Sequence, residues 1–316
     1  MTRFYAADCD PSGGIYLCTL TDHGVKKEAF TPLDRPMYFT VKDGVCHALL
    51  RAPFENSRES GYVRIPLAPD GSFAAPGEVL STRGIVACHL SVVNGAVYAA
   101  NYTSGSVIKL PDLLAERHGK GAHPTRQNSP HTHMAIPTPD KKFLAVTDLG
   151  TDEIVLYDFD LRELSRTKLP PGSGPRHLVF SPDGTKAYCS CELSSEAAFL
   201  SYQNGVFTYL FSKSTLPEGE TCQNAPAAIR LQGDRLFVSN RGHDSIAVFD
   251  LKNPDPPLIF PSGGKSPWDF DLSGDTLFVC NHKSGSVAFF SVNGTDVRPL
   301  PFSLSLHAPI CLFLAE

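Results

Sequence analysis

The chain has 316 residues, of which 42% are hydrophobic and 19% charged, with 25 glycines and 26 prolines. This balance fits a folded, turn-rich protein and argues against a disordered or collagen-like chain. A formal net charge of −5 gives no broad basic surface for nucleic acid or an anionic membrane, so neither is an expected partner.

The N-terminal sequence MTRFYAADCDPSGG lacks the apolar core of a signal peptide, and no apolar run is long enough to span a membrane. The chain contains nine cysteines, and the closest pair, Cys189 and Cys191, has the same-face spacing of a strand. We therefore expect free thiols in a reducing compartment and a cytoplasmic location.

Five stretches share one pattern, which is a short apolar strand, a polar residue, a turn and a second strand, and two stretches upstream of them are weaker copies. In chain order they are FYAADCDPSGGIYLCTL (4–20), VCHALLRAPFENSRESGYVRI (45–65), AVYAANYTSGSV (96–107), FLAVTDLGTDEI (143–154), KAYCSCELSSEA (186–197), RLFVSNRGHDSI (235–246) and TLFVCNHKSGSV (276–287). Between the third and fourth, PDLLAERHG suggests one short helix around residues 113–117.

The spacing of these copies sets the architecture. Their anchor residues Asp8, Leu50, Asn101, Asp148, Cys191, Asn240 and Asn281 are 42, 51, 47, 43, 49 and 41 residues apart. That is the length of a four-stranded propeller blade. The C-terminal HAPICLFLAE has no following mate and the N-terminal RFYAAD has no preceding one, so pairing them would close the ring. The sequence predicts an all-β, seven-bladed β-propeller with four antiparallel strands per blade, forming a single domain over residues 1–316.

Antiparallel pairing also predicts where polar side chains meet. The start of one strand and the end of the next lie at the same edge of a hairpin, so GPRHLVFSPDGTKAYCSCE (174–192) places Arg176 and His177 beside Glu192. The same rule brings further side chains to one mouth of the central channel, namely His89, His131, His133, Asp148, Arg241, Trp268 and His282.

Most of these residues could also have a purely structural role. Arg176 and Glu192 could equally form an ion pair that only holds one blade together. His89, His177 and His282 could simply bond to backbone at strand ends, and Asp148 could form a turn. His131 and His133 share a face, but no third ligand follows them at a clear spacing, so a metal is not expected.

Three segments carry a resemblance, NSPHTHMAIPTPDKKFLAVTDLGTDEIVLYDFD (128–160), GPRHLVFSPDGTKAYCSCELSS (174–195) and LFVSNRGHDSIAVF (236–249). They resemble the seven-bladed propeller lactonase family, which contains bacterial 6-phosphogluconolactonases and fungal carboxymuconate lactonizing enzymes. The resemblance covers roughly residues 85 to 292. It implies a channel lined by four catalytic residues, His133, Arg176, Glu192 and Arg241, with His131, His177 and Asp148 in support.

The resemblance implies a lactone hydrolase that needs no cofactor or metal and acts on a small anionic lactone. Glu192 would activate water, Arg176 and Arg241 would stabilise negative charge, and His133 would be an acid or an orienting donor. Trp268 stands where family members commonly have an arginine, which leaves the phosphate specificity open. The alternatives are a muconate-type lactonizing cycloisomerase and a non-enzymatic propeller that binds other proteins. The sequence does not fix the oligomeric state.

Overall fold

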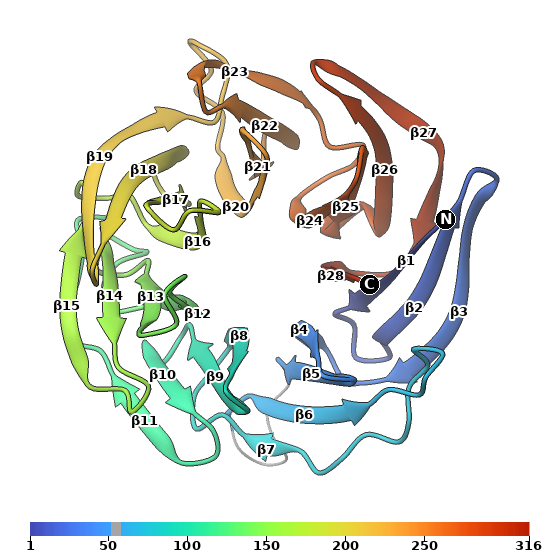
Figure 1. The fold of residues 1–316 in the computed structure, drawn as a ribbon, viewed down its shortest axis with the longest axis horizontal. Helices are drawn as coiled ribbons and strands as arrows, with labels where there is room; N and C mark the ends of the chain where they lie inside the picture. Colours follow the sequence, from blue (N-terminus) through green and yellow to red (C-terminus); the bar gives the residue numbers. More distant parts are fainter. Residues whose placement is uncertain (52–57, 316) are drawn as a thin grey trace.

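The computed structural model describes residues 1–51 and 58–315, so residues 52–57 of the second sequence copy and Glu316 lie outside the described part. Within it, seven four-stranded sheets form a ring around a central axis (Figure 1). Neighbouring strands in each sheet are antiparallel, as expected for strands that follow one another through short hairpin links. The prediction of an all-β, seven-bladed propeller with four antiparallel strands per blade is confirmed.

We number the blades 1 to 7 in the order in which their second strands occur in the chain. The innermost strands are β28 (Pro309–Leu314), β4 (Pro36–Lys42), β8 (Ala87–Val93), β12 (Thr132–Pro137), β16 (Pro175–Phe180), β20 (Ala225–Gln232) and β24 (Pro267–Ser273). The second strands are β1 (Thr2–Asp8), β5 (Val45–Leu50), β9 (Ala96–Asn101), β13 (Leu144–Asp148), β17 (Lys186–Cys191), β21 (Arg235–Arg241) and β25 (Thr276–Asn281).

The two outer layers complete each blade. The third strands are β2 (Gly14–Thr21), β6 (Gly61–Pro66), β10 (Ser106–Lys109), β14 (Glu153–Tyr157), β18 (Glu196–Gln203), β22 (Ser245–Asp250) and β26 (Ser286–Asn293). The outermost strands are β3 (Gly24–Pro32), β7 (Leu80–Ser81), β11 (Leu113–Glu116), β15 (Glu163–Lys168), β19 (Val206–Ser214), β23 (Asn253–Pro261) and β27 (Asp296–Ser305).

Blade 1 closes the ring from both ends of the chain. Strand β28 pairs antiparallel with β1, from Phe4 opposite Leu314 to Asp8 opposite Pro309, and the two termini lie side by side (Figure 1). The buried Asp8 carboxylate accepts hydrogen bonds from the backbone N–H groups of His307, at 3.0 Å, and Ala308, at 2.7 Å. The predicted pairing of the terminal strands is therefore confirmed, and it covers an edge that would otherwise be open.

The hydrophobic core lies between the blades. Within the described residues, seven apolar clusters occupy the seven junctions between neighbouring blades. At the junction of blades 7 and 1, for example, the rings of Phe278 and Phe4 meet edge to face with centroids 5.2 Å apart. Each sheet thus buries both faces, which explains why the second strands are apolar along most of their length.

The predicted helix around residues 113–117 is wrong. Leu113–Glu116 form strand β11, which pairs with β10 from Ser106 opposite Glu116 to Lys109 opposite Leu113. The segment has good helix formers, but a four-residue stretch gains more from completing the sheet than from one isolated helical turn. Among the described residues the one helical element is the 3-10 turn η1 (His282–Ser284), and none is long and apolar enough to cross a bilayer.

Candidate active site

A β-bulge at the start of the inner strand recurs in every blade. The pairing of each inner strand with its neighbour shifts register at this point in all seven sheets. The residues that the shift leaves unpaired include His133, Arg176, His177 and Trp268. Because bulges redirect side chains and commonly lie next to active sites, this repeated irregularity explains how several polar side chains turn towards one place.

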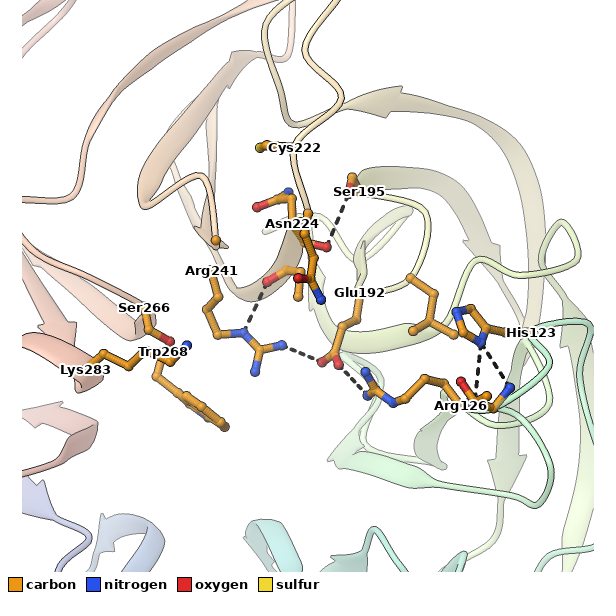
Figure 2. Close-up of a pocket in the computed structure, with 15 residues that line it drawn as sticks. His123, Arg126, Glu192, Ser195, Cys222, Asn224, Arg241, Ser266, Trp268 and Lys283 are labelled. Atoms are coloured by element: carbon orange, nitrogen blue, oxygen red, sulfur yellow. Dashed lines mark hydrogen bonds and ion pairs between the residues drawn. The ribbon is translucent and has the colours of Figure 1, made fainter.

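Glu192 is the centre of the resulting cluster. It follows β17 and is almost fully buried, with 7% of its side chain exposed. Its Oε2 lies 2.6 Å from Arg241 Nη2 and 3.2 Å from Arg176 Nε, while its Oε1 lies 2.6 Å from Arg126 Nη2. Figure 2 shows the carboxylate between the guanidinium groups of Arg241 and Arg126. One buried carboxylate thus meets three arginines from different parts of the ring.

These arginines dominate the electrostatics of Glu192. Burial alone would raise the pKa of the Glu192 carboxyl, but the positive charges of Arg241, Arg176 and Arg126 outweigh it and hold that pKa well below its usual range. Burial and the neighbouring Arg241 lower the pKa of Arg176 to about 10, which leaves it a cation at neutral pH. Glu192 and Arg176 are therefore both ionised in the neutral range.

We expect this ion cluster to give the protein a measurable acid sensitivity. The pKa of Glu192 is lower in the folded than in the unfolded chain, so its stabilisation is present above its usual value of 4.5 and is lost as the pH falls towards the folded value. Urea unfolding between pH 5 and pH 3 should show a shallower loss of stability in Glu192→Gln than in the wild type, by up to about 1.4 kcal/mol per pH unit. Equal slopes in the two proteins would contradict this assignment.

Three buried imidazoles lie in contact with one another beside the cluster. The rings of His133 and His177 meet edge to face at 5.2 Å, and those of His177 and His89 at 5.8 Å. Burial, reinforced by the positive charge of Arg230 and Arg176, lowers the pKa of His89 to about 3. Burial and Arg176 likewise lower the pKa values of His133 and His177 well below their usual range. All three rings are therefore neutral at pH 7.

Two buried residues of the site, His177 and Arg176, have side-chain nitrogens without a hydrogen bond. Among the described residues, neither ring nitrogen of His177 has a hydrogen-bond partner, and neither do Nη1 and Nε of Arg176, although Nε lies at ion-pair distance from Glu192. Buried polar atoms of this kind are normally satisfied by water or a ligand. The inner end of the site is thus lined by donors and acceptors whose hydrogen-bonding capacity the chain itself does not use.

Aromatic rings border the cluster on two sides. The Arg241 guanidinium lies over the ring of Trp268 at 4.6 Å from its centroid, and Trp268 in turn lies 5.1 Å from the ring of His282. On the opposite side, His131 stacks on Tyr102 with centroids 4.5 Å apart. The Trp268 ring thus helps to hold the Arg241 guanidinium in place by stacking as well as by charge.

The cluster opens into a pocket of about 740 Å³. Its lining includes Arg126, Glu192, Cys222, Arg241, Trp268 and Lys283 (Figure 2). Among the described lining residues Glu192 is the only acid, so the pocket is electropositive although the whole chain carries −5. A pocket of this kind concentrates small anions.

The structure brings most of the predicted site residues together. Glu192 contacts both Arg176 and Arg241, and all three are close enough to affect the pKa of His133. His131, Trp268 and His282 lie around them, and His177 and His89 follow His133 through ring contacts.

Asp148 has a different environment. Its carboxylate is fully buried and accepts hydrogen bonds from His131 N at 2.8 Å, Gly150 N at 3.0 Å and Arg117 Nε at 3.1 Å. The anchors Asn101 and Asn240 likewise bind backbone at the equivalent place in their blades. Asp148 therefore fixes the backbone at the start of β12. Of the predicted site residues, all of which the structure describes, Glu192, Arg241 and Trp268 line the pocket, whereas the others, Asp148 among them, do not.

Of the two cationic pocket residues that the sequence prediction did not name, Lys283 and Arg126, it is Arg126 that contacts Glu192. It lies in the segment between β11 and β12, outside every repeated strand. The one available signal was its position in HPTRQNSPHTH, five residues before His131.

Among the described residues, no group of three or more histidine, cysteine or acidic side chains has the arrangement of a metal site.

Comparison with known proteins extends this description to the whole chain. The family model described as "Lactonase, 7-bladed beta-propeller" matches residues 3–313. An uncharacterized protein of Staphylococcus epidermidis is 33% identical over 285 residues, which cover 82% of this chain and 82% of that protein.

Two solved structures share the fold over nearly their full length. A protein from Lactobacillus plantarum superimposes with a TM-score of 0.88 at 27% identity, covering 100% of this chain and 99% of its own. The periplasmic gluconolactonase PpgL of Pseudomonas aeruginosa superimposes with a TM-score of 0.87 at 22% identity, covering 100% of this chain and 99% of its own. At the latter identity the likeness concerns the fold.

Proposed function

The chain belongs to the seven-bladed β-propeller lactonase family, and from that premise we propose that it hydrolyses the lactone of an anionic sugar acid, with 6-phosphogluconolactone as the first candidate. The resemblance noted in the sequence is confirmed at the level of the family. The observation that carries the proposal is the buried Glu192 carboxylate among Arg126, Arg176 and Arg241 at the base of an electropositive pocket.

The positive charge of the pocket supports an anionic substrate. Arg126, Arg241 and Lys283 line it, and Arg176 lies directly behind Glu192, so four cations oppose one carboxylate. Guanidinium groups bind phosphate and carboxylate oxygens through paired hydrogen bonds. A lactone bearing a phosphate or a carboxylate would be held by these groups, whereas a neutral lactone would use few of them.

The proposed reaction begins with a water molecule activated by Glu192. The water oxygen forms a bond to the lactone carbonyl carbon while Glu192 takes one of its protons, and the carbonyl electron pair moves onto oxygen. Arg176 and Arg241 stabilise this oxyanion, with the unused Arg176 Nη1 available as a donor. The carbonyl then re-forms, the ring C–O bond breaks, and the proton on Glu192 passes to the departing ring oxygen.

His133 supports this scheme as a neutral group. Because burial and Arg176 hold its pKa well below the usual range, His133 does not carry the extra proton of an imidazolium at neutral pH. It serves instead as a hydrogen-bond donor or acceptor that orients the water or the ring oxygen. The proton cycle then runs through Glu192 alone, and the product is the open-chain hydroxy acid.

A direct assay tests the proposal. Purified protein should accelerate the opening of 6-phosphogluconolactone, corrected for spontaneous hydrolysis, with kcat/KM of about 10⁴ M⁻¹s⁻¹ or more. Because guanidinium groups supply the positive charge in this scheme, dialysis against EDTA should change kcat less than about twofold. Glucono-δ-lactone and a carboxymuconolactone complete the substrate panel.

Each outcome of the assay has a meaning. Turnover of the muconolactone alone would replace the sugar lactone as substrate and favour the cycloisomerase alternative. Absence of acceleration with all three compounds would contradict the hydrolase and favour a binding propeller. Activity that disappears with EDTA and returns with a divalent cation would contradict the metal-independent mechanism.

A further inference from the structure

Arg126 differs from the other two arginines in how it is held. It comes from the segment between β11 and β12, and 43% of its side chain is exposed, against 13% for Arg241 and 3% for Arg176. Its Nη2 donates to Glu192 Oε1 at 2.6 Å and to the Tyr102 hydroxyl at 3.0 Å. Arg241, in contrast, is fixed by the Ala225 carbonyl and by the ring of Trp268. Of the three, Arg126 can leave the carboxylate at the lowest cost in packing.

The backbone beneath this half-exposed side chain is firmly attached. The buried Gln127 side chain donates to the Leu149 carbonyl and to Asp152 Oδ1, both at 2.7 Å, and accepts from His123 N at 2.7 Å. The Arg126 N–H donates to His123 Nδ1 at 3.2 Å. Arg126 is therefore a long, partly exposed side chain on a fixed backbone, and its guanidinium group points to Glu192 in the pocket (Figure 2).

The resting arrangement poses a problem for a general base. Both oxygens of Glu192 are engaged by guanidinium groups, and the depressed pKa makes this carboxylate a weak proton acceptor. Each carboxylate oxygen can accept two hydrogen bonds, so water can still reach Glu192, but it meets a stronger base once a guanidinium group has left one oxygen. Oε2 is held by the two less exposed arginines, so Oε1 is the oxygen that can be released.

We propose that Arg126 binds the anionic group of the substrate and, in moving away from Glu192 to do so, releases Oε1 for the attacking water. This inference rests on the proposed lactonase activity and adds a specificity-determining residue to it. Leaving Glu192 also removes one nearby positive charge, which makes the carboxylate a stronger base. An anionic substrate thus improves the reactivity of the site that it occupies, whereas a neutral lactone leaves Arg126 on Glu192.

The test compares an anionic with a neutral lactone in Arg126→Gln. With 6-phosphogluconolactone, kcat/KM should fall by about 10- to 100-fold, the range for losing one or two charge-assisted hydrogen bonds. With glucono-δ-lactone, kcat should rise, because Arg126 no longer binds Glu192 and the carboxylate is a stronger base. The acid limb of the pH profile should move to higher pH in the variant, since loss of a positive neighbour raises the pKa of Glu192.

A matched control comes from Arg3, which is exposed to 36% and pairs with Glu28 at 3.0 Å on the outer surface. Arg3→Gln should leave the ratio of anionic to neutral activity unchanged, and Arg126→Lys should restore part of it. Equal losses of kcat/KM on both lactones in Arg126→Gln, or an unchanged ratio, would overturn the inference.

Binding measurements separate this inference from the proposed function. If the wild type opens none of the lactones, the lactonase proposal fails, and calorimetry with 6-phosphogluconate and gluconate then judges Arg126. The wild type should bind the phosphorylated acid at least about 10-fold more tightly than Arg126→Gln does, with no such difference for gluconate. Equal affinity of both proteins for 6-phosphogluconate would overturn the inference independently.

Discussion

Replacing Glu192 with glutamine is expected to lower kcat for lactone hydrolysis by about a thousandfold, within the range for loss of a general base. The amide has nearly the same shape but cannot accept a proton from water. It also leaves the buried Arg176 without a counter-charge, so the free energy of unfolding should fall by about 3 kcal/mol. Steady-state kinetics and urea unfolding of the same preparation measure both effects.

A second buried carboxylate, Glu153, provides a control that distinguishes loss of activity from loss of stability. Glu153 has 5% of its side chain exposed and is paired with Arg117 in blade 4. Glu153→Gln should retain kcat within about threefold and lose less stability, because Arg117 keeps Asp148 at 3.1 Å and Glu163 at 3.2 Å as counter-charges. If Glu192→Gln keeps its activity, or if Glu153→Gln loses as much, the carboxylate of Glu192 is a structural group and the proposed base lies elsewhere.

The fold could be predicted from the sequence because each blade repeats the same order of apolar strand, polar residue and turn. Anchor residues 41 to 51 apart lie at or next to the end of the second strand in every blade, from Asp8 to Asn281. Strand pairing is then constrained by the apolar faces that each sheet must bury between its neighbours. Leu113–Glu116 is the exception, because a helix was predicted there and a strand is found. The helix propensity of four residues is outweighed by pairing with the neighbouring strand β10.

The site was only partly visible in the sequence. The hairpin rule places Arg176 beside Glu192, and the structure has them 3.2 Å apart. The rule says nothing of the bulges that turn these side chains towards the axis, since a bulge depends on the pairing register and not on composition. Arg126 belongs to no repeat, and its contact with Glu192 spans 66 positions. Irregular segments between blades therefore cannot be assigned to a site from local sequence patterns alone.

Truncation of Arg241 to alanine is expected to reduce kcat by about 10²- to 10³-fold, the usual effect of losing one preorganised donor to a developing oxyanion. The structure supplies the preorganisation. Nε donates to the Ala225 carbonyl at 3.1 Å, Nη2 donates to Glu192 at 2.6 Å, and the group lies over Trp268. Arg241→Lys should recover little of the loss, because an ammonium group cannot make these contacts together.

Strand β21 carries its own control for this prediction. Arg235 stands at the other end of the same strand, with its guanidinium 5.6 Å from the ring centroid of Phe237. Arg235→Ala removes an arginine from an aromatic face away from the pocket and should keep kcat within about twofold. A rise in KM with unchanged kcat in Arg241→Ala would mean that Arg241 binds the ground state and the transition state equally, which would remove it from the proposed oxyanion site. A fall in kcat in both variants would instead indicate that the packing of blade 6 is lost. Only a fall in kcat confined to Arg241→Ala assigns Arg241 as the donor to the developing oxyanion.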